Sequence, residues 1–165
     1  MPRWDFGPHG TIVDAETFAC VTELETRQAA RLKYAISVLT IHRSRDGEGA
    51  DHAAAAEQLA EVVSPVIRRT DIIEVVPSAA TVRVLLVGGE LEDLRAIVHR
   101  IIAEVSYYRS GEQRALVVSI GGSCFPATAA DSRELLVQAD TLAAEVRREK
   151  GSYSTYRLHG RLGTS

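Results

Sequence analysis

The sequence is poor in cysteine and aromatic residues, and it lacks a strong excess of positive charge. Its two cysteines, Cys20 and Cys124, stand alone, which excludes a disulfide framework or a cysteine-rich metal site. They are expected to be small apolar side chains in a reducing compartment, and this favours a cytoplasmic location. The net charge of -3 argues against a nucleic-acid partner, which would normally face a basic surface.

Long hydrophobic runs are also missing. No apolar stretch approaches the roughly 20 residues that span a bilayer, and the first residues lack the apolar core of a signal peptide. No membrane partner is therefore expected. What is present is ordinary for one folded domain: 165 residues, of which 45% are hydrophobic and 25% are charged, can bury a real core.

Two apolar, β-branched segments near the middle of the chain predict a β-hairpin. They are residues 71–76 and 81–87, and only Pro77-Ser78-Ala79-Ala80 separates them. Strands this apolar need cover on both faces, so we expect them inside a sheet between helices. The turn offers little chemistry, because Ser78 alone carries a polar side chain.

Periodicity and turn residues place the other elements around this hairpin. Residues 1–13 show no period and are interpreted as an N-terminal arm or connector, while residues 14–165 are interpreted as one domain. Helices are expected at about 14–34, 51–69, from 90 onward and at 133–150, with further strands at 35–42, 115–120 and 153–158.

Without its first helix, this order reads strand–helix–strand–strand–helix–strand. Right-handed crossovers put both inner helices on one face of the sheet, and the first and last helices can cover the other face. The predicted fold class is therefore α/β, an α+β sandwich with a mainly antiparallel, ferredoxin-like βαββαβ sheet flanked by helices on both faces. Asp14 and Ser132 are the expected N-caps, and Phe18, Leu24 and Leu32 are expected to face the core.

Three segments of the C-terminal third form a familiar pattern. They are Val117-Val118-Ser119-Ile120-Gly121, then Phe125-Pro126, then Glu134-Leu135-Leu136-Val137-Gln138-Ala139-Asp140. In this order they resemble the GGDEF domain of diguanylate cyclases. The helix that ends in Arg68-Arg69-Thr70-Asp71 and the hairpin after it extend the resemblance to nearly the whole chain from about Asp14. It implies a nucleotide-cyclase-type sheet, the architecture already predicted.

The catalytic residues that this resemblance would imply are absent. The Gly-Gly-Asp/Glu-Glu-Phe turn, whose acids serve metal binding and catalysis in that family, falls on residues 77–81. His42 or a neighbour replaces a metal-binding aspartate, and an imidazole is a poor ligand for Mg²⁺. Residues 45–52 replace the base-reading segment, 10–14 are a remnant of the entry motif, and Arg147 is nearest to the phosphate-contacting lysine. We therefore predict a degenerate domain without catalytic residues, metal or cofactor.

One binding pattern of the family is retained. Arg68-x-x-Asp71 lies at the offset of the inhibitory site that binds cyclic di-GMP in active cyclases, and Arg100 is nearest to an arginine that completes that site. An arginine fork can bond to guanine O6 and N7, and a carboxylate can accept from the base. The resemblance thus implies a cyclic di-GMP receptor that binds through Arg68, Asp71 and Arg100 and regulates a protein partner.

Ordinary roles remain open for the same residues. Arg68 and Arg69 at a helix C-terminus interact favourably with the helix dipole, and Asp71 can pair with one of them on the surface. Arg100 can be a solvated helix residue. The alternative function is therefore a protein-interaction or dimerisation module, a homodimer included, that kept the fold without a ligand.

Overall fold

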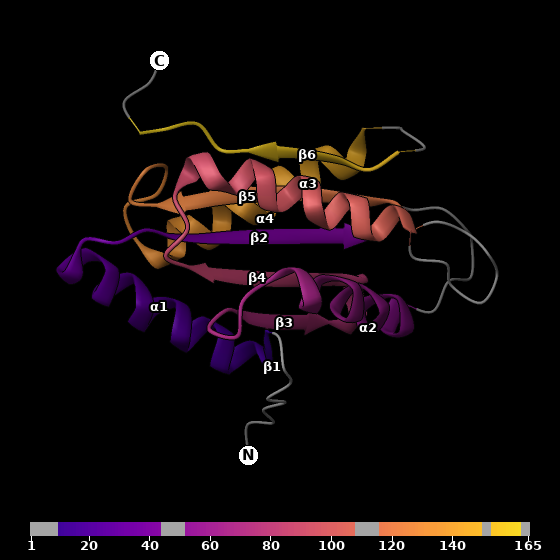
Figure 1. Cartoon of the computed structure of the whole chain (residues 1–165), viewed down its shortest axis with the longest axis horizontal. Helices are drawn as coiled ribbons and strands as arrows, with labels where there is room; N and C mark the ends of the chain where they lie inside the picture. Colours follow the sequence, from indigo (N-terminus) through magenta and orange to yellow (C-terminus); the bar gives the residue numbers. More distant parts are fainter. Residues whose placement is uncertain (1–9, 44–51, 108–115, 150–152, 163–165) are drawn as a thin grey trace.

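A computed structural model describes residues 10–43, 52–107, 116–149 and 153–162 as a six-stranded sheet with a helical layer on each face (Figure 1). The strands are β1 (Thr11–Val13), β2 (Ile36–Arg43), β3 (Ile72–Val76), β4 (Thr81–Val87), β5 (Val118–Phe125) and β6 (Thr155–Leu158). The helices are α1 (Ala15–Leu32), α2 (His52–Val63), α3 (Leu91–Tyr107) and α4 (Ser132–Arg148), and two 3₁₀ turns, η1 (Ser64–Val66) and η2 (Pro77–Ala79), flank β3.

The sheet has the predicted ferredoxin-like core. Its strand order is β1-β3-β4-β2-β5-β6, and β3, β4, β2 and β5 pair antiparallel. The edge strands β1 and β6 pair parallel with β3 and β5. Helices α2 and α3 cover one face of the sheet, and α1 and α4 cover the other (Figure 1). The fold class and the placement of the helices are therefore confirmed.

The central strand β2 shows why the sheet needs both layers. Leu39 and Ile41 pack in the core beneath α2 and α3, whereas Ile36 and Val38 pack in the core beneath α1 and α4. All four side chains are fully buried. Because successive residues of a strand point to opposite faces, an apolar run is stable only where both faces are covered.

The buried face of α1 differs from the predicted one. Phe18 is buried as expected, but Leu24 and Leu32 are 58% and 56% exposed. Thr22 and Thr26 face the sheet instead, and each hydroxyl donates to the carbonyl oxygen four residues earlier. This local bond satisfies a buried hydroxyl, so threonine can occupy a position that hydropathy assigns to leucine.

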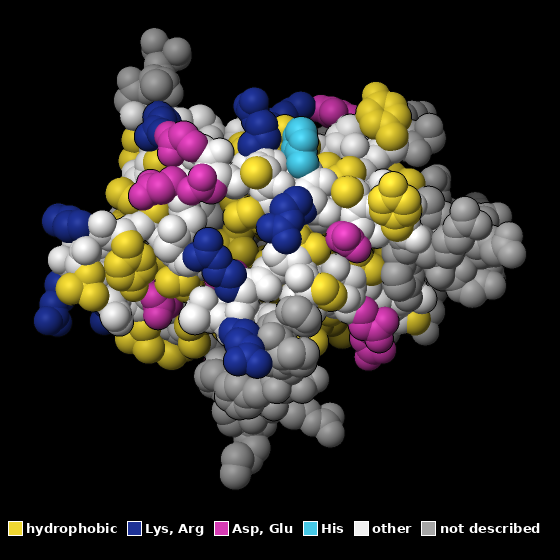
Figure 2. All heavy atoms as spheres, viewed as in Figure 1, with side chains coloured by type: hydrophobic (Ala, Val, Ile, Leu, Met, Phe, Trp, Pro, Cys, Tyr) yellow, Lys and Arg dark blue, Asp and Glu magenta, His cyan; other side chains and the backbone are white. Residues whose placement is uncertain are grey.

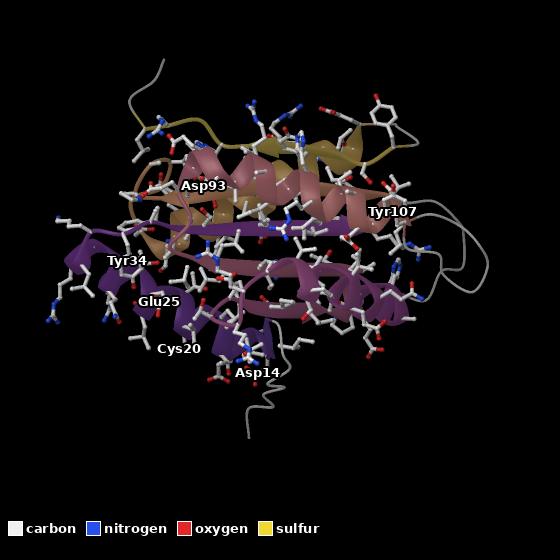
Figure 3. All side chains as sticks on the ribbon, viewed as in Figure 1. Asp14, Cys20, Glu25, Tyr34, Asp93 and Tyr107 are labelled. Atoms are coloured by element: carbon white, nitrogen blue, oxygen red, sulfur yellow. The ribbon has the colours of Figure 1, made fainter. Side chains whose placement is uncertain are left out.

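Two helices begin at aspartate caps. The Asp14 carboxylate accepts a hydrogen bond from the Thr17 amide at 2.7 Å, as predicted. Hydrogen bonds from Thr17, first from its side chain and then from its amide, lower the pKa of Asp14. Figure 3 shows Asp14 at the start of α1. At α4 the cap is Asp131 and not the predicted Ser132, because Asp131 accepts from the Glu134 amide at 2.8 Å.

Strand β5 runs further than the predicted 115–120, of which 115 lies outside the described residues. It continues through Gly121 to Phe125. A Cβ on Gly121 would overlap the Ala139 carbonyl oxygen and the Ala143 amide nitrogen. The glycine therefore lets α4 pack directly on the strand. A strand prediction from residue propensities ends too early here, because glycine has a low strand propensity.

Two further boundaries differ from the predicted ones. Helix α2 ends at Val63 and not near residue 69, because Pro65 lies in η1, where it cannot donate a helical hydrogen bond. Residues 11–13, assigned to an arm by the sequence, form β1 at the sheet edge. Residues 1–9 of that arm lie outside the described part of the chain. No helix among the described residues is long and apolar enough to cross a membrane.

Candidate functional site

The turn between β3 and β4 is closed and contains no acidic residue. Pro77, Ser78 and Ala79 form η2, and Ala80 follows in the left-handed region (φ 50°, ψ 50°) with 2% of its surface exposed. A non-glycine residue in this conformation costs roughly 1–2 kcal/mol. Helix α2 packs against the turn. The turn therefore presents a proline ring and β-carbons where a metal or phosphate site would need carboxylates or open amides.

His42, near the end of β2, forms a hydrogen bond with Thr81 directly after this turn. Its Nδ1 lies 2.5 Å from Thr81 Oγ1, and that hydroxyl donates its own proton to the Ala79 carbonyl oxygen at 2.9 Å. The imidazole must therefore be the donor to Thr81. Burial, followed by the charge of Arg147, lowers the pKa of His42 from 6.5 to about 4. His42 is thus a neutral hydrogen-bond donor at physiological pH.

A charged cluster lies between the sheet and α4. Arg83 of β4 reaches Asp140 of α4 through Nε and Nη2, each 2.9 Å from a carboxylate oxygen. The Nη1 of Arg83 lies 3.3 Å from both carboxylate oxygens of Glu74 on β3. Thr40 of β2 donates to Asp140 at 2.6 Å. The cluster therefore ties three neighbouring strands to α4.

The charges of this cluster are shielded to different extents. The side chain of Glu74 is 8% exposed, that of Arg83 is 24% exposed and that of Asp140 is 39% exposed. Burial raises the pKa of Glu74 although Arg83 opposes the shift. Both carboxylates are engaged by one guanidinium, which makes the cluster structural. Within the described ranges, no group of three or more His, Cys, Asp or Glu side chains could hold a metal ion.

Arg68 and Asp71 close the turn that connects η1 to β3. Asp71 Oδ2 accepts from the Arg68 amide at 2.8 Å, and the Asp71 amide donates to the Arg68 carbonyl oxygen at 3.0 Å. Asp71 Oδ1 accepts from the Val87 amide at the end of β4 at 2.9 Å. Asp71 is 2% exposed, and burial raises its carboxyl pKa despite these bonds. It is therefore not the surface ion-pair partner that the sequence left open.

The two arginines of the predicted site are exposed. Arg68 follows η1, Arg100 lies on α3, and α3 packs against η1, so the two come from neighbouring elements. Several Lys and Arg side chains gather near the middle of the face that carries α2 and α3 (Figure 2). The predicted ligand set thus consists of two exposed cations and one buried carboxylate whose oxygens bind backbone amides.

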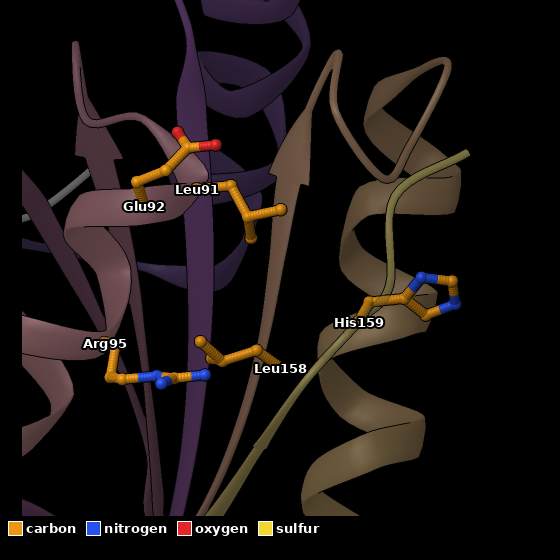
Figure 4. A pocket seen from close by; sticks show the side chains of 5 residues that line it. All are labelled: Leu91, Glu92, Arg95, Leu158 and His159. Carbon is orange, nitrogen blue, oxygen red and sulfur yellow. The ribbon is translucent and has the colours of Figure 1, made fainter. Parts of the chain in front are cut away.

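A separate hollow of about 450 Å³ opens between α3 and β6 (Figure 4). It is lined by Leu91, Glu92 and Arg95 from α3, by Leu158 at the end of β6 and by His159 directly after it. The imidazole of His159 points away from Leu91 and Arg95, and Glu92 forms an ion pair with Arg161. The polar groups of the hollow therefore do not converge on one point, and none of them belongs to the Arg68 turn.

The whole fold can be compared with known proteins. No protein-family model and no curated protein matches the sequence. The solved structure of the GGDEF domain of PA1120 (YfiN or TpbB) from Pseudomonas aeruginosa matches with a TM-score of 0.77 and 20% identity, covering 88% of this chain and 95% of that one. The chain has the GGDEF-domain fold. The sequence resemblance is thereby confirmed for the architecture.

Two similar structures were solved with a bound molecule. The GGDEF domain of DgcB from Caulobacter crescentus, in complex with c-di-GMP, matches with a TM-score of 0.71 and 12% identity over 90% of this chain and 92% of that one. The diguanylate cyclase SiaD from Pseudomonas aeruginosa, in complex with its activator SiaC, matches with a TM-score of 0.68 and 12% identity over 87% of this chain and 58% of that one. At these identities the likeness concerns the GGDEF fold and assigns no role to a residue of this chain.

The cluster of Glu74, Arg83 and Asp140 was not predicted, although the sequence carries a signal for part of it. Glu74 and Arg83 each interrupt an otherwise apolar strand, and in the hairpin register they lie directly opposite each other. Opposite charges at such a pair of positions indicate an ion pair. Nothing in the local pattern pointed to Asp140, which reaches Arg83 across 57 residues.

Proposed function

We propose that this chain is a non-catalytic GGDEF-fold domain that binds cyclic di-GMP at the Arg68 turn and regulates a protein partner. The absence of catalysis is supported by the β3–β4 turn, in which Ala79 and Ala80 provide no metal ligand. It is also supported by His42, whose Nδ1 is engaged by Thr81. A metal-dependent cyclisation would need hard oxygen ligands near these two positions.

The observation that carries the binding proposal is the exposed Arg68 on a turn whose backbone is fixed by Asp71. A guanidinium presents a planar fork that matches guanine O6 and N7 or two phosphate oxygens, and a fixed backbone limits the entropy lost on binding. Arg100 on the adjacent α3 supplies a second cation for the same dianionic ligand. The DgcB domain, which has the same fold, was solved with c-di-GMP.

In this proposal Asp71 belongs to the site but supports Arg68 from the backbone side. Its two carboxylate oxygens already accept from Arg68 and Val87. A guanine N–H would have to compete with these amides inside a nearly closed environment. Ligand contact therefore falls chiefly on Arg68 and Arg100.

The alternative, a protein-interaction or dimerisation module without a ligand, is favoured by a different observation. Large apolar side chains are exposed on several elements: Leu24, Leu32, Tyr107, Val137, Tyr153 and Leu162. Asp71 also has a sufficient structural role without any ligand. SiaD, solved with its activator SiaC, shows that a protein containing this fold can bind a protein partner.

Calorimetric titration with cyclic di-GMP separates the two functions. We expect the wild type to bind, and Arg68→Ala to lose roughly tenfold to hundredfold in affinity because a charge-assisted, bidentate contact is removed. Arg100→Ala should lose affinity in the same direction. The matched control is Arg69→Ala, which removes the same side chain from the next position and should change affinity much less.

Failure of the wild type to bind, or equal losses in the Arg68 and Arg69 variants, would overturn the receptor proposal and leave the interaction module. Activity is tested on the same preparation with GTP and Mg²⁺ or Mn²⁺. No cyclic dinucleotide is expected, and product above a no-enzyme control in mass spectrometry would overturn the non-catalytic assignment.

A further inference from the structure

Asp71 joins three segments that are far apart in the sequence. Its carboxylate accepts from the amides of Arg68 and Val87, and its main-chain carbonyl oxygen accepts from the amide of Thr11 at 3.0 Å. The turn before β3, the end of β4 and the first residue of β1 therefore share one anchor. Asp71 is buried and the two bonds to its carboxylate are partly buried, so the loss of one leaves an oxygen of a buried side chain without its partner.

The docking of β1 depends on this same region. β1 is only three residues long and, among the described strands, pairs with β3 alone, from Thr11 opposite Ile72 onward. Gly10 lies against the side chain of Ile67, so closely that a Cβ on Gly10 would overlap it. A short edge strand has few contacts of its own, so its local stability is set by what it meets at the sheet edge. For β1 these partners are β3 and, at Gly10 and Thr11, the side chain of Ile67 and the carbonyl oxygen of Asp71.

The conformation of the Arg68 turn depends on Asp71 as well. The Arg68 amide and carbonyl groups are both bonded to Asp71, which fixes the backbone from which the exposed guanidinium projects. A shift of Asp71 on release of β1 would therefore change where the guanidinium of Arg68 lies. In the same way, a ligand that orders Arg68 would stabilise the docked state of β1.

We propose that Asp71 is a positioning residue that couples the docking of β1 to the conformation of the Arg68 turn. The docking of β1 and the binding of a ligand by Arg68 then influence each other. The part of this inference that concerns the ligand rests on the proposed function, whereas the coupling between β1 and the turn does not. Such coupling is reciprocal, so each event must strengthen the other by the same factor.

The test removes the Thr11 N–H, which donates to the Asp71 carbonyl oxygen. Thr11→Pro removes this N–H while proline remains compatible with the first residue of an edge strand. Thr11→Ala, the matched control, shortens the side chain but keeps the amide. Hydrogen exchange is then measured at the amides of Arg68 and Val87, both of which donate to the Asp71 carboxylate.

We expect these two amides to exchange about fivefold faster, or more, in Thr11→Pro, and close to the wild-type rate in Thr11→Ala. Asp71→Asn, which can keep only one acceptor oxygen, should in return speed exchange at the Thr11 amide. Unchanged exchange of Arg68 and Val87 in Thr11→Pro, with the rest of the sheet still protected, would overturn the coupling. Loss of protection throughout the sheet in both Thr11 variants would do so too, because β1 would then act as a general stabiliser.

Cyclic di-GMP binding provides the second arm of the test. Where the wild type binds, Thr11→Pro should weaken affinity about fivefold while Thr11→Ala does not, and ligand should slow exchange in β1. Equal affinity in all three proteins would overturn the link between β1 and the ligand. Absence of binding to the wild type would overturn the proposed function, and the exchange of Arg68 and Val87 without ligand would still decide the coupling.

Discussion

Replacing Arg83 by methionine should destabilise the fold through the charges that it leaves behind. Methionine preserves most of the side-chain length but removes the guanidinium that contacts Glu74 and Asp140. Breaking a buried ion pair by removing one partner typically costs about 3–5 kcal/mol. Asp140 is 39% exposed and can be solvated after the change, whereas Glu74 is 8% exposed and cannot. We therefore expect a loss of about 2–3 kcal/mol, which is below the fully buried case.

The assay is urea unfolding at pH 7, with thermal unfolding as a second measure. In a domain of this size, each kcal/mol corresponds to about 2–4 °C in Tm, so a decrease of roughly 4–12 °C is expected. Arg27→Met is the matched control, because it deletes an arginine from the exposed pair with Glu23 on α1. Its cost should be below about 0.5 kcal/mol.

The dependence of this loss on pH tests its cause. The pKa of Glu74 in the folded protein is raised by burial, and Arg83 partly opposes this shift, so the variant should raise it further. A carboxyl whose folded pKa lies above its unfolded value binds its proton more tightly in the native state. The destabilisation caused by this carboxyl therefore grows as the pH rises from its unfolded pKa to its folded pKa, and it decreases on acidification. A deficit of Arg83→Met that equals that of Arg27→Met, or grows from pH 7 to pH 5, would refute this reasoning.

Two further predictions concern the packing of α4 and the protonation of His42. Gly121→Ala should destabilise the domain by about 1–3 kcal/mol in urea unfolding, because its Cβ would meet the backbone of α4 at Ala139. Gly89→Ala, which meets no atom within 4 Å, is the control, and equal effects of the two changes would contradict the account. The folded pKa of His42, about 4 against 6.5, means that its stability contribution is complete above pH 6.5 and is lost as the pH falls toward 4. His42→Gln should therefore weaken the loss of stability between pH 7 and pH 5, and an unchanged pH profile would contradict this role.

The inner sheet could be predicted because its signals are local and repeated. The apolar, β-branched runs on both sides of Pro77-Ser78-Ala79-Ala80 specify two strands and a tight connection, and handedness then fixes the crossovers. β1 was not predicted, because three residues carry no detectable period. Their strand conformation comes from pairing with β3 and from the contact of Gly10 with Ile67. Such an edge strand is specified by its tertiary partner.

Some core positions predicted from hydropathy were wrong because hydropathy does not count side-chain hydrogen bonds. In α1, hydropathy favours Leu24 and Leu32 over Thr22 and Thr26, yet the threonines are buried and the leucines are exposed. The difference lies in hydrogen bonds of the threonine hydroxyls to the helix backbone, which a hydropathy pattern does not count.

Asp71 shows why a short polar motif needs its backbone context before it is assigned to a ligand. An aspartate three residues after Arg68 can accept a hydrogen bond from the Arg68 amide and so close a turn. Asp71 makes this bond. The Arg-x-x-Asp spacing is thus explained by the turn alone, with or without a ligand. The side chain of Arg68 is explained only in part, because its charge favours the ionised Asp71 while the hydrogen bonds of the turn use the Arg68 backbone. The proposed receptor function therefore depends on the two exposed guanidinium groups, at Arg68 and Arg100. Replacing Asp71 changes the stability of the fold as well, so a loss of cyclic di-GMP binding in such a variant is compared with its loss of stability.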